Sequence, residues 1–238
     1  MKDNRMMFFI FMLGTFTVGM AEYVVTGLLT QIASDMKVPI SSAGLLISVY
    51  AISVALIGPL MRVFTLKVRA QRLLPVLMAI FIISNIIGML APNFPILLLS
   101  RLLSASMHAP FFGVCMSVAA AVAPRGKKPQ AIALVQAGLT IAVMIGVPFG
   151  SFLGGFANWR FVFGVMILLA VITMLGMMKF VPHVALSTEA SVKKELKVFK
   201  NPHILIVMAI IVFGYSGVFT TYTFMEPMIH KYAPFGIV

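Results

Sequence analysis

Charged side chains are scarce in this sequence, and acidic ones are the scarcest. Of 238 residues, Asp and Glu supply 6 and Lys and Arg supply 18, so that charged residues make up only 10% of the chain. Apolar residues reach 61%, and the mean hydropathy is +1.07. A soluble domain of this length needs a polar surface that this composition cannot supply. The composition therefore predicts an integral membrane protein.

Cysteine is almost absent, since Cys115 stands alone and excludes a disulfide within the chain. The sequence also lacks a Walker A segment, a cluster of metal ligands and a nucleophile elbow. We therefore expect no enzymatic activity, no metal site and no cofactor.

Long uncharged runs are what the chain has in abundance. A membrane helix needs roughly 20 apolar residues, and the runs therefore predict an all-α integral membrane fold with about seven transmembrane helices. The expected spans cover residues 6–29, 43–64, 73–90, 95–123, 131–156, 161–180 and 204–229.

The basic residues are distributed unevenly between the two ends of these spans. With a cytoplasmic N-terminus, the outer loops hold only Lys37, Arg160 and Lys231. This asymmetry follows the positive-inside rule. It predicts a multi-pass protein of the cell (plasma) inner membrane. The expected partner of the basic residues is the lipid bilayer, and we expect no nucleic-acid binding. The basic residues assigned to the cytoplasmic side are Lys2, Arg5, Lys67, Arg69, Arg72, Arg125, Lys127, Lys128, Lys193, Lys194, Lys197 and Lys200.

One long polar segment divides the chain. We expect six helices over residues 1–181, a cytoplasmic linker over 182–202 and a seventh helix within 203–238. In the linker, Val192, Leu196 and Phe199 have helical spacing among lysines, which suits an amphipathic helix on an anionic membrane surface. A solvated charged linker is the alternative.

Three ionisable residues inside the spans are candidates for function: Glu22, Arg101 and His108. A charge at the bilayer centre costs about 2.5–3.5 kcal/mol on insertion scales. Counted from the predicted helix ends, Glu22 and Arg101 lie at similar depth. We therefore hypothesise that they face a common cavity and couple to protons, because an acid beside an arginine can gain or lose its proton as the cavity opens.

Two structural alternatives remain for these ionisable residues. Glu22 and Arg101 could form a static pair that fixes helix packing, and His108 could be a hydrogen-bonded packing residue. Helical spacing places further small or polar residues beside Glu22, which indicates a cavity wall. The residues assigned to the substrate cavity are Thr15, Gly19, Thr26, Tyr50 and Tyr222.

The fifth predicted span carries a stripe of small residues interrupted by a proline. Small residues at a spacing of four let helices approach closely. Generic helix packing is the alternative interpretation, but it explains less well the proline and the Asn-Trp-Arg that follows at 158–160. The members of the stripe are Gly138, Gly146, Pro148, Gly150 and Gly154.

Several segments together resemble the major facilitator superfamily, in its drug:proton antiporter branch and close to the arabinose-efflux-permease-like group. The resemblance rests on "GMAEYVVTGLLTQIASDMKV", on "SSAGLLISVYAISVALIGP", on Arg101 followed by "HAPFFG", on the glycine stripe followed by "WR", and on "YTFMEPMI". The segments follow the family's order over nearly the whole chain. Ala109-Pro110 stands where the family usually has Gly-Ala, and the basic loop at 62–72 lacks the acid and glycines of the family's motif A.

This resemblance implies roles for individual residues. Arg101 takes the place of the family's proton-transfer arginine, Glu22 that of its acid in the first helix, and the glycine stripe that of antiporter motif C. The fold implied is the N-terminal six-helix half of a transporter plus helix 7, and a missing C-terminal half is one expected partner.

The resemblance favours a secondary active transporter that exports a small molecule, such as a sugar, a nucleoside or a drug-like compound, in exchange for protons by alternating access. The alternative is a truncated, non-transporting remnant or a membrane-associated partner protein. A seven-helix receptor or retinal protein explains less, since the seventh span has no internal lysine for a Schiff base.

Overall fold

The chain is helical throughout the residues that the structure, a computed structural model, describes: 2–65, 68–182 and 201–232. Within those ranges seven helical segments are long and apolar enough to cross a membrane. The prediction of an all-α membrane fold with seven spans is therefore confirmed.

The spans agree with the predicted ones to within three residues at every described boundary except the end of the first and of the last. The helices of spans two to six include the short α3 (Ile40–Ala43), which leads into α4. They are α4 (Leu45–Thr65), α5 (Ala70–Met89), α6 (Phe94–Val122), α7 (Lys128–Ile141) continued by η2 (Ala142–Gly146) and α8 (Val147–Phe156), and α9 (Trp159–Phe180).

The first span is longer than predicted and consists of three pieces. The α-helix α1 (Lys2–Tyr23) passes into a 3₁₀ helix, η1 (Val24–Leu28), and then into α2 (Leu29–Asp35). The predicted end at residue 29 is wrong because it marked only the end of the apolar run. The polar turn beyond it stays helical, since α2 has buried side chains of its own, Ile32 and Ala33.

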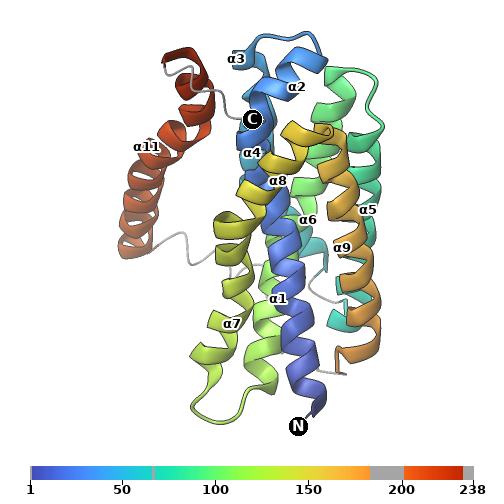
Figure 1. The fold of residues 1–238 in the computed structure, drawn as a ribbon. Coiled ribbons are helices and arrows are strands. Elements are labelled where there is room, and N and C mark those ends of the chain that lie inside the picture. The colour runs from blue at the N-terminus through green and yellow to red at the C-terminus, as the bar shows by residue number, and fades with distance from the viewer. Residues whose placement is uncertain (1, 66–67, 183–200, 233–238) are drawn as a thin grey trace. The chain divides into compact units, whose positions relative to one another are not determined.

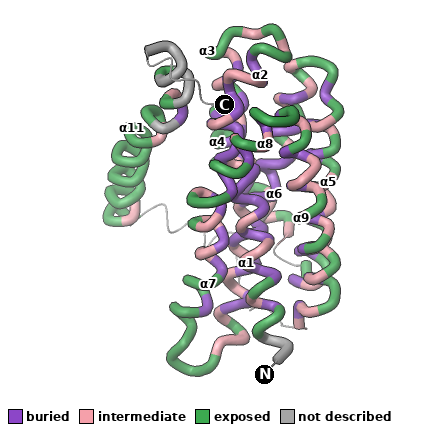
Figure 2. The backbone as a smooth tube through the Cα atoms, in the orientation of Figure 1, coloured by how far each residue is buried: buried purple, intermediate pink, exposed green. Residues whose placement is uncertain are grey.

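The first span also forms the axis of the six-span bundle. In Figure 1, α1 (dark blue) passes between α7 and α8 on one side and α9 on the other, and Figure 2 shows it buried along much of its length. Around it α4 packs on α6, and α5 packs on α6 and α9. The described residues of α1 and η1 therefore meet neighbours on opposite faces.

The chain divides into two compact units, Met1–Leu186 and Ser187–Val238. The second unit contains α11 (Pro202–Tyr232), whose described side chains are mostly exposed. The proposed division at residues 181 and 202 stays a prediction. The amphipathic segment around Val192 and the side chain of Tyr222 lie outside the described residues.

Candidate functional site

The candidate site lies where Glu22, the acid near the end of α1, meets α6. Glu22 is the penultimate residue of α1, directly before the helix tightens into η1. Its Oε2 lies 3.8 Å from Nε2 of His108 on α6, and its side chain is 26% exposed against 11% for the histidine. The acid is thus the more accessible member of a mostly buried pair.

Tyr50 on α4 connects this pair to the buried arginine. Its hydroxyl lies 3.0 Å from Nδ1 of His108, and the Arg101 guanidinium carbon lies 4.2 Å above the centre of its ring. A cation over an aromatic face is attracted by the ring quadrupole. His108 also stacks on Phe112, with ring centroids 4.7 Å apart and planes 7° from parallel. Three helices thereby assemble one chain of contacts, which we call the polar cluster: Glu22, His108, Tyr50 and Arg101.

Arg101 is 1% exposed but incompletely bonded. Among the described residues, its Nε and one terminal nitrogen have no hydrogen-bond partner, and neither does the Ser104 hydroxyl one turn away. A buried donor without a partner costs roughly 1–3 kcal/mol. The cluster therefore holds a cation that this arrangement of helices does not fully satisfy.

The direct partner predicted for Glu22 differs from the observed one. We expected Arg101 at the depth of Glu22, and the basic side chain that lies 3.8 Å from Glu22 is His108, seven residues or two turns further along α6; this contact is an ion pair only when the histidine is protonated. The first span ends at Asp35 and not at residue 29, which places Glu22 further from the end of its span than the depth estimate assumed. Arg101 belongs to the same polar cluster through Tyr50, and a common cavity for Glu22 and Arg101 stays a prediction. His108 is correspondingly both a packed residue and the neighbour of the acid.

Three residues assigned to the substrate cavity are buried, and two of them lie in a contact between helices. Thr15 is fully buried and its hydroxyl donates to the Val135 carbonyl on α7 at 2.6 Å. Gly19 faces Leu139 of the same helix. Thr26 is 3% exposed and bonds to the Tyr23 carbonyl. Thr15 and Gly19 therefore lie in the α1–α7 contact, and their assignment to a substrate cavity stays a prediction.

The glycine stripe lies against the same face of the first span as Thr15 and Gly19. A Cβ added at Gly138 would collide with the Met12 carbonyl and the Thr15 hydroxyl, one at Gly150 with Val24, and one at Gly154 with Leu28. Gly146 packs on Phe16 and Met20 with contacts of 3.4 Å for the same added atom. The stripe thus lets α7 and α8 approach α1 and η1 closely. Pro148 lies in the first turn of α8, directly after the π-helical η2.

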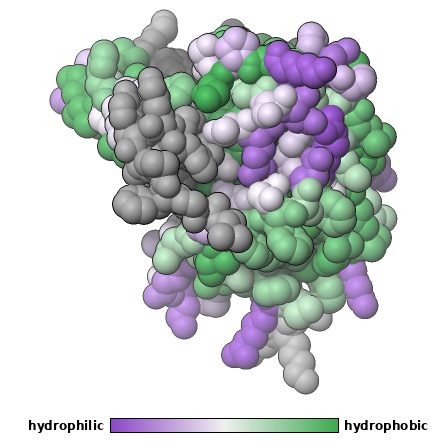
Figure 3. Space-filling view, turned by 45° about the horizontal axis from the view of Figure 1, so that its top comes forward, coloured by the Kyte–Doolittle hydropathy of each residue, from purple (hydrophilic) through white to green (hydrophobic). Residues whose placement is uncertain are grey.

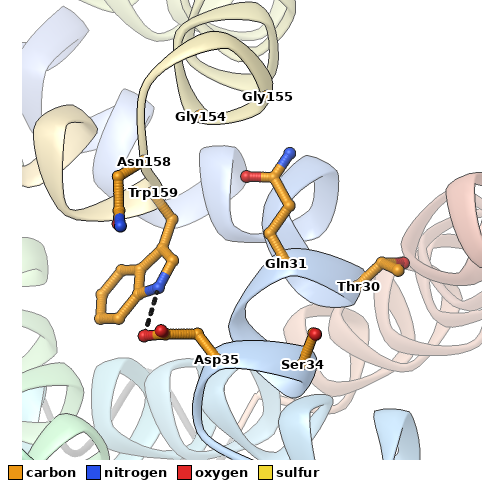
Figure 4. A pocket seen from close by; sticks show the side chains of 8 residues that line it. All are labelled: Thr30, Gln31, Ser34, Asp35, Gly154, Gly155, Asn158 and Trp159. Atoms are coloured by element: carbon orange, nitrogen blue, oxygen red, sulfur yellow. Dashed lines mark hydrogen bonds between the residues drawn. The ribbon is translucent and has the colours of Figure 1, made fainter.

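A second polar site closes the end of the bundle that carries α2. Asp35 Oδ2 accepts from the Trp159 indole nitrogen at 3.0 Å (Figure 4) and from the Arg160 guanidinium. Arg160 also donates to the Ala91 carbonyl at 3.2 Å, and it stacks on Trp159 at 4.3 Å. This group, the Asp35 clasp, joins the ends of α2, α5 and α9.

An open cavity of about 470 Å³ lies beside the Asp35 clasp, between α2 and the turn after α8. In Figure 4, Gln31 points toward Gly154 and Gly155. With its amide nitrogen toward Gly154, Gln31 donates to that carbonyl at 2.9 Å and accepts from the Gly155 nitrogen at 3.2 Å. Figure 3 shows hydrophilic side chains gathered over this end of the bundle. Our sequence reasoning missed Asp35, although an acid at the end of one span and an arginine at the start of another were the available signal.

Comparison with known proteins supports a transporter fold. The chain is 45% identical to the uncharacterised MFS-type transporter YfhI of Bacillus subtilis over 98% of its length and 59% of that protein's. It is 38% identical to the inner membrane transport protein YdhP of Escherichia coli, over 92% and 56% of the two chains. A probable sugar efflux transporter of Helicobacter pylori is 34% identical, over 99% and 60%. The chain thus spans less than two thirds of the length of these curated relatives.

Solved structures with low sequence identity share the fold. A bacterial homologue of the human lysosomal transporter Spinster superposes with a TM-score of 0.73 at 18% identity, over 95% of this chain and 55% of that one. The nucleoside transporter NupG gives 0.73 at 14% identity, over 98% and 60%. The family model of the Major Facilitator Superfamily matches residues 11–236. The chain therefore belongs to the Major Facilitator Superfamily.

Proposed function

We propose that this chain takes part in the proton-coupled export of a small molecule by alternating access, with the polar cluster as the coupling site. The observation that carries the proposal is the contact between the partly exposed acid Glu22 and the buried His108–Tyr50–Arg101 chain. Ionisable groups this deep in a membrane helix bundle are costly and mark ion or proton pathways.

Glu22 is the residue that we assign to receive and release the proton. It combines partial exposure with a histidine at 3.8 Å and a buried arginine in the same cluster. When Glu22 is protonated, its attraction to the Arg101 guanidinium on α6 weakens, which changes how strongly α1 and α6 hold together. The unsatisfied donors of Arg101 favour a second arrangement in which they find partners.

We further assign the chain to the antiporter branch of the family. The support is the glycine stripe of α7 and α8, which resembles antiporter motif C and packs on α1 and η1, the segment that carries Glu22. We assign the N-terminus to the cytoplasm, because the exposed basic loop Arg125–Lys128 lies at the same end of the bundle as the start of α1 (Figure 1).

The substrate class that we propose is a small polyhydroxylated or drug-like molecule, in keeping with the sugar efflux transporter named among the relatives. The test is a proteoliposome assay with a pH-sensitive dye inside the vesicles. L-Arabinose, uridine and ethidium are added in turn under an imposed pH gradient. We expect proton flux linked to at least one compound, and its loss in Glu22→Gln.

A second candidate is a membrane-associated partner that does not transport by itself. Its support is that the chain spans 59% of its Bacillus subtilis relative. In the same assay this candidate predicts no flux with the chain alone, and restored flux when a polypeptide corresponding to the remaining length of that relative is reconstituted with it.

A further inference from the structure

The end of the bundle opposite the Asp35 clasp is rich in basic residues. The sequence places one acid, Asp3, near the start of α1 at this end, and no Asp or Glu occurs between Asp35 and Glu189. The cations exposed at this end form no ion pair with an acid among the described residues. Exposed cations therefore predominate among the described side chains of this surface. Its exposed members are Arg5, Arg69, Arg72, Arg125, Lys127, Lys128 and Lys179.

Helix packing brings four of these cations into one group. The Gln71 amide donates to the Val181 carbonyl at 3.3 Å, which sets the start of α5, with Arg69 and Arg72, beside the end of α9, with Lys179. On the other side of α9, Ile10 of α1 packs against Gly176. Arg5 lies five residues before Ile10 and Lys179 three after Gly176, so both project past this contact toward the same end.

These four cations lie at the boundaries of the apolar spans. Arg5 begins the first span, Arg69 and Arg72 flank the start of the third at Ala70, and Lys179 is one residue from the end of the sixth. Lysine and arginine at helix ends extend their charged heads to the membrane surface while the stems stay on apolar groups. Lys179 has this form, with its nitrogen 5.5 Å from the centre of the Phe180 ring.

We propose that Arg5, Arg69, Arg72 and Lys179 form a binding surface for the headgroups of anionic phospholipids, which we call the lipid clamp. Lipid is the partner because the charges stand where the apolar spans end, and the ends of membrane spans lie in the headgroup region of a bilayer. A soluble polyanion such as nucleic acid would need cations that reach further from the bilayer. Each cation near an anionic membrane surface strengthens attraction by about fivefold.

The test measures lipid selectivity directly. The chain is reconstituted in phosphatidylcholine membranes with spin-labelled phosphatidylglycerol or phosphatidylcholine, and the fraction of motionally restricted label is compared. We expect phosphatidylglycerol to associate at least about fivefold more strongly at 0.1 M salt. The ratio of phosphatidylglycerol to phosphatidylcholine association should fall toward one at 1 M salt, because the screening length falls from about 10 Å to about 3 Å.

Variants locate the surface. The triple change Arg69→Gln, Arg72→Gln and Lys179→Gln is expected to remove most of the preference. Lys37→Gln, an exposed cation at the Asp35 clasp end, is the matched control and should leave it intact. Equal association of the two lipids with the parent chain overturns the proposal, and this measurement needs no variant.

Two further results would also overturn the assignment. One is a preference that survives the triple change and disappears when Arg125, Lys127 and Lys128 become Gln, since the loop would then be the site. The other is strong binding of a soluble polyanion, polyglutamate, to the chain in phosphatidylcholine membranes without any phosphatidylglycerol preference.

Discussion

The two faces of the first span differ in how they are held. Toward α7 and α8, the contact is made by glycines whose missing side chains let the helices approach, and the hydroxyl of Thr15 is fully used. Toward α4 and α6, the contact is made by Glu22 and the polar cluster, where Arg101 keeps two nitrogens unpaired. One face is close-packed and satisfied, and the other is polar and incompletely satisfied.

This difference assigns two roles to two faces of the first span: one face holds the span in place, and the other can change its bonding. A close-packed contact has one arrangement, because interiors at crystal-like density resist deformation. A polar contact with unpaired donors has alternatives of similar energy, because other partners can be found. The glycine face is therefore suited to hold the first span in place while the polar cluster changes its bonding.

Gly138→Ala should give the largest effect, because it breaks the close-packed face. The new methyl group collides with the backbone carbonyl of Met12 and with the side-chain hydroxyl of Thr15, which donates a hydrogen bond to the Val135 carbonyl. Overpacking of this kind costs about 1–3 kcal/mol. The measurement is the free energy of unfolding in mixed micelles, titrated with a denaturing detergent.

The matched control for Gly138→Ala is Gly113→Ala. An added methyl at Gly113, on α6, meets no atom within 4 Å. Alanine is the better helix former by about 1 kcal/mol, so this variant should be neutral or slightly more stable. Equal destabilisation by both changes would contradict the role given to the glycine face.

Tyr50→Phe tests the polar face with a smaller expected loss. The change removes the hydroxyl that meets His108 and keeps the ring beneath Arg101. One buried hydrogen bond contributes about 1 kcal/mol. Tyr50→Leu, which also removes the aromatic face, should lose more in the same unfolding titration. Identical values for the two variants would show that the ring contributes nothing through its contact with the cation.

Asp35→Asn tests how much the Asp35 clasp, at the end of the first span, contributes to stability. It weakens the ion pair with Arg160. The Arg160 side chain is 32% exposed and the Asp35 side chain 39% exposed. Partly exposed ion pairs contribute at most about 1 kcal/mol. We expect a loss below that of Tyr50→Phe, reduced further by salt. A salt-independent loss above 2 kcal/mol, on the scale of a buried pair, would show that the Asp35 clasp behaves as buried.

Glu22→Gln should change the free energy of unfolding least of the five variants. A loss of coupling without a loss of stability would separate the role of the polar face from that of the glycine face. The variant keeps the shape and removes a charge from the interior of the bundle, so that lost attraction and avoided desolvation offset one another. Unfolding should shift by less than about 0.5 kcal/mol, whereas substrate-linked proton flux in proteoliposomes should vanish. Coupling that is unchanged across pH would refute the role of Glu22, and Ser48→Ala, an exposed position on α4, is the control.

Apolar periodicity and charge placement were enough to predict the spans. They could not predict that residues 30–35 stay helical, because that depends on the packing of Ile32 and Ala33 and on Gln31 reaching the end of α8. Because the first span ends six residues later than predicted, the depth estimate pointed to Arg101, whereas the side chain that lies 3.8 Å from Glu22 is His108, two turns further along α6. The depth of a residue within a span can be counted from the sequence, but the helix end from which it is counted is determined by tertiary contacts.

The facing directions of side chains were the other part that the sequence did not determine. Spacing placed Thr15, Gly19 and Glu22 on one stripe, yet Thr15 and Gly19 meet α7 while Glu22 meets α6. The stripe winds around the helix enough to reach two neighbours. Tyr50 was assigned to the substrate cavity, and that role stays a prediction; its position between the histidine and the arginine required the crossing of α4 and α6.

The Asp35 clasp has a consequence for assembly. Arg160 stands at the start of the sixth span, and its two partners outside α9, Asp35 and Ala91, belong to the ends of the first and third. During synthesis the chain emerges from its N-terminus, so the first five spans enter the membrane before this arginine exists to join them. The contact therefore cannot form before the start of the sixth span has been made, and its formation brings together the ends of the first, third and sixth spans.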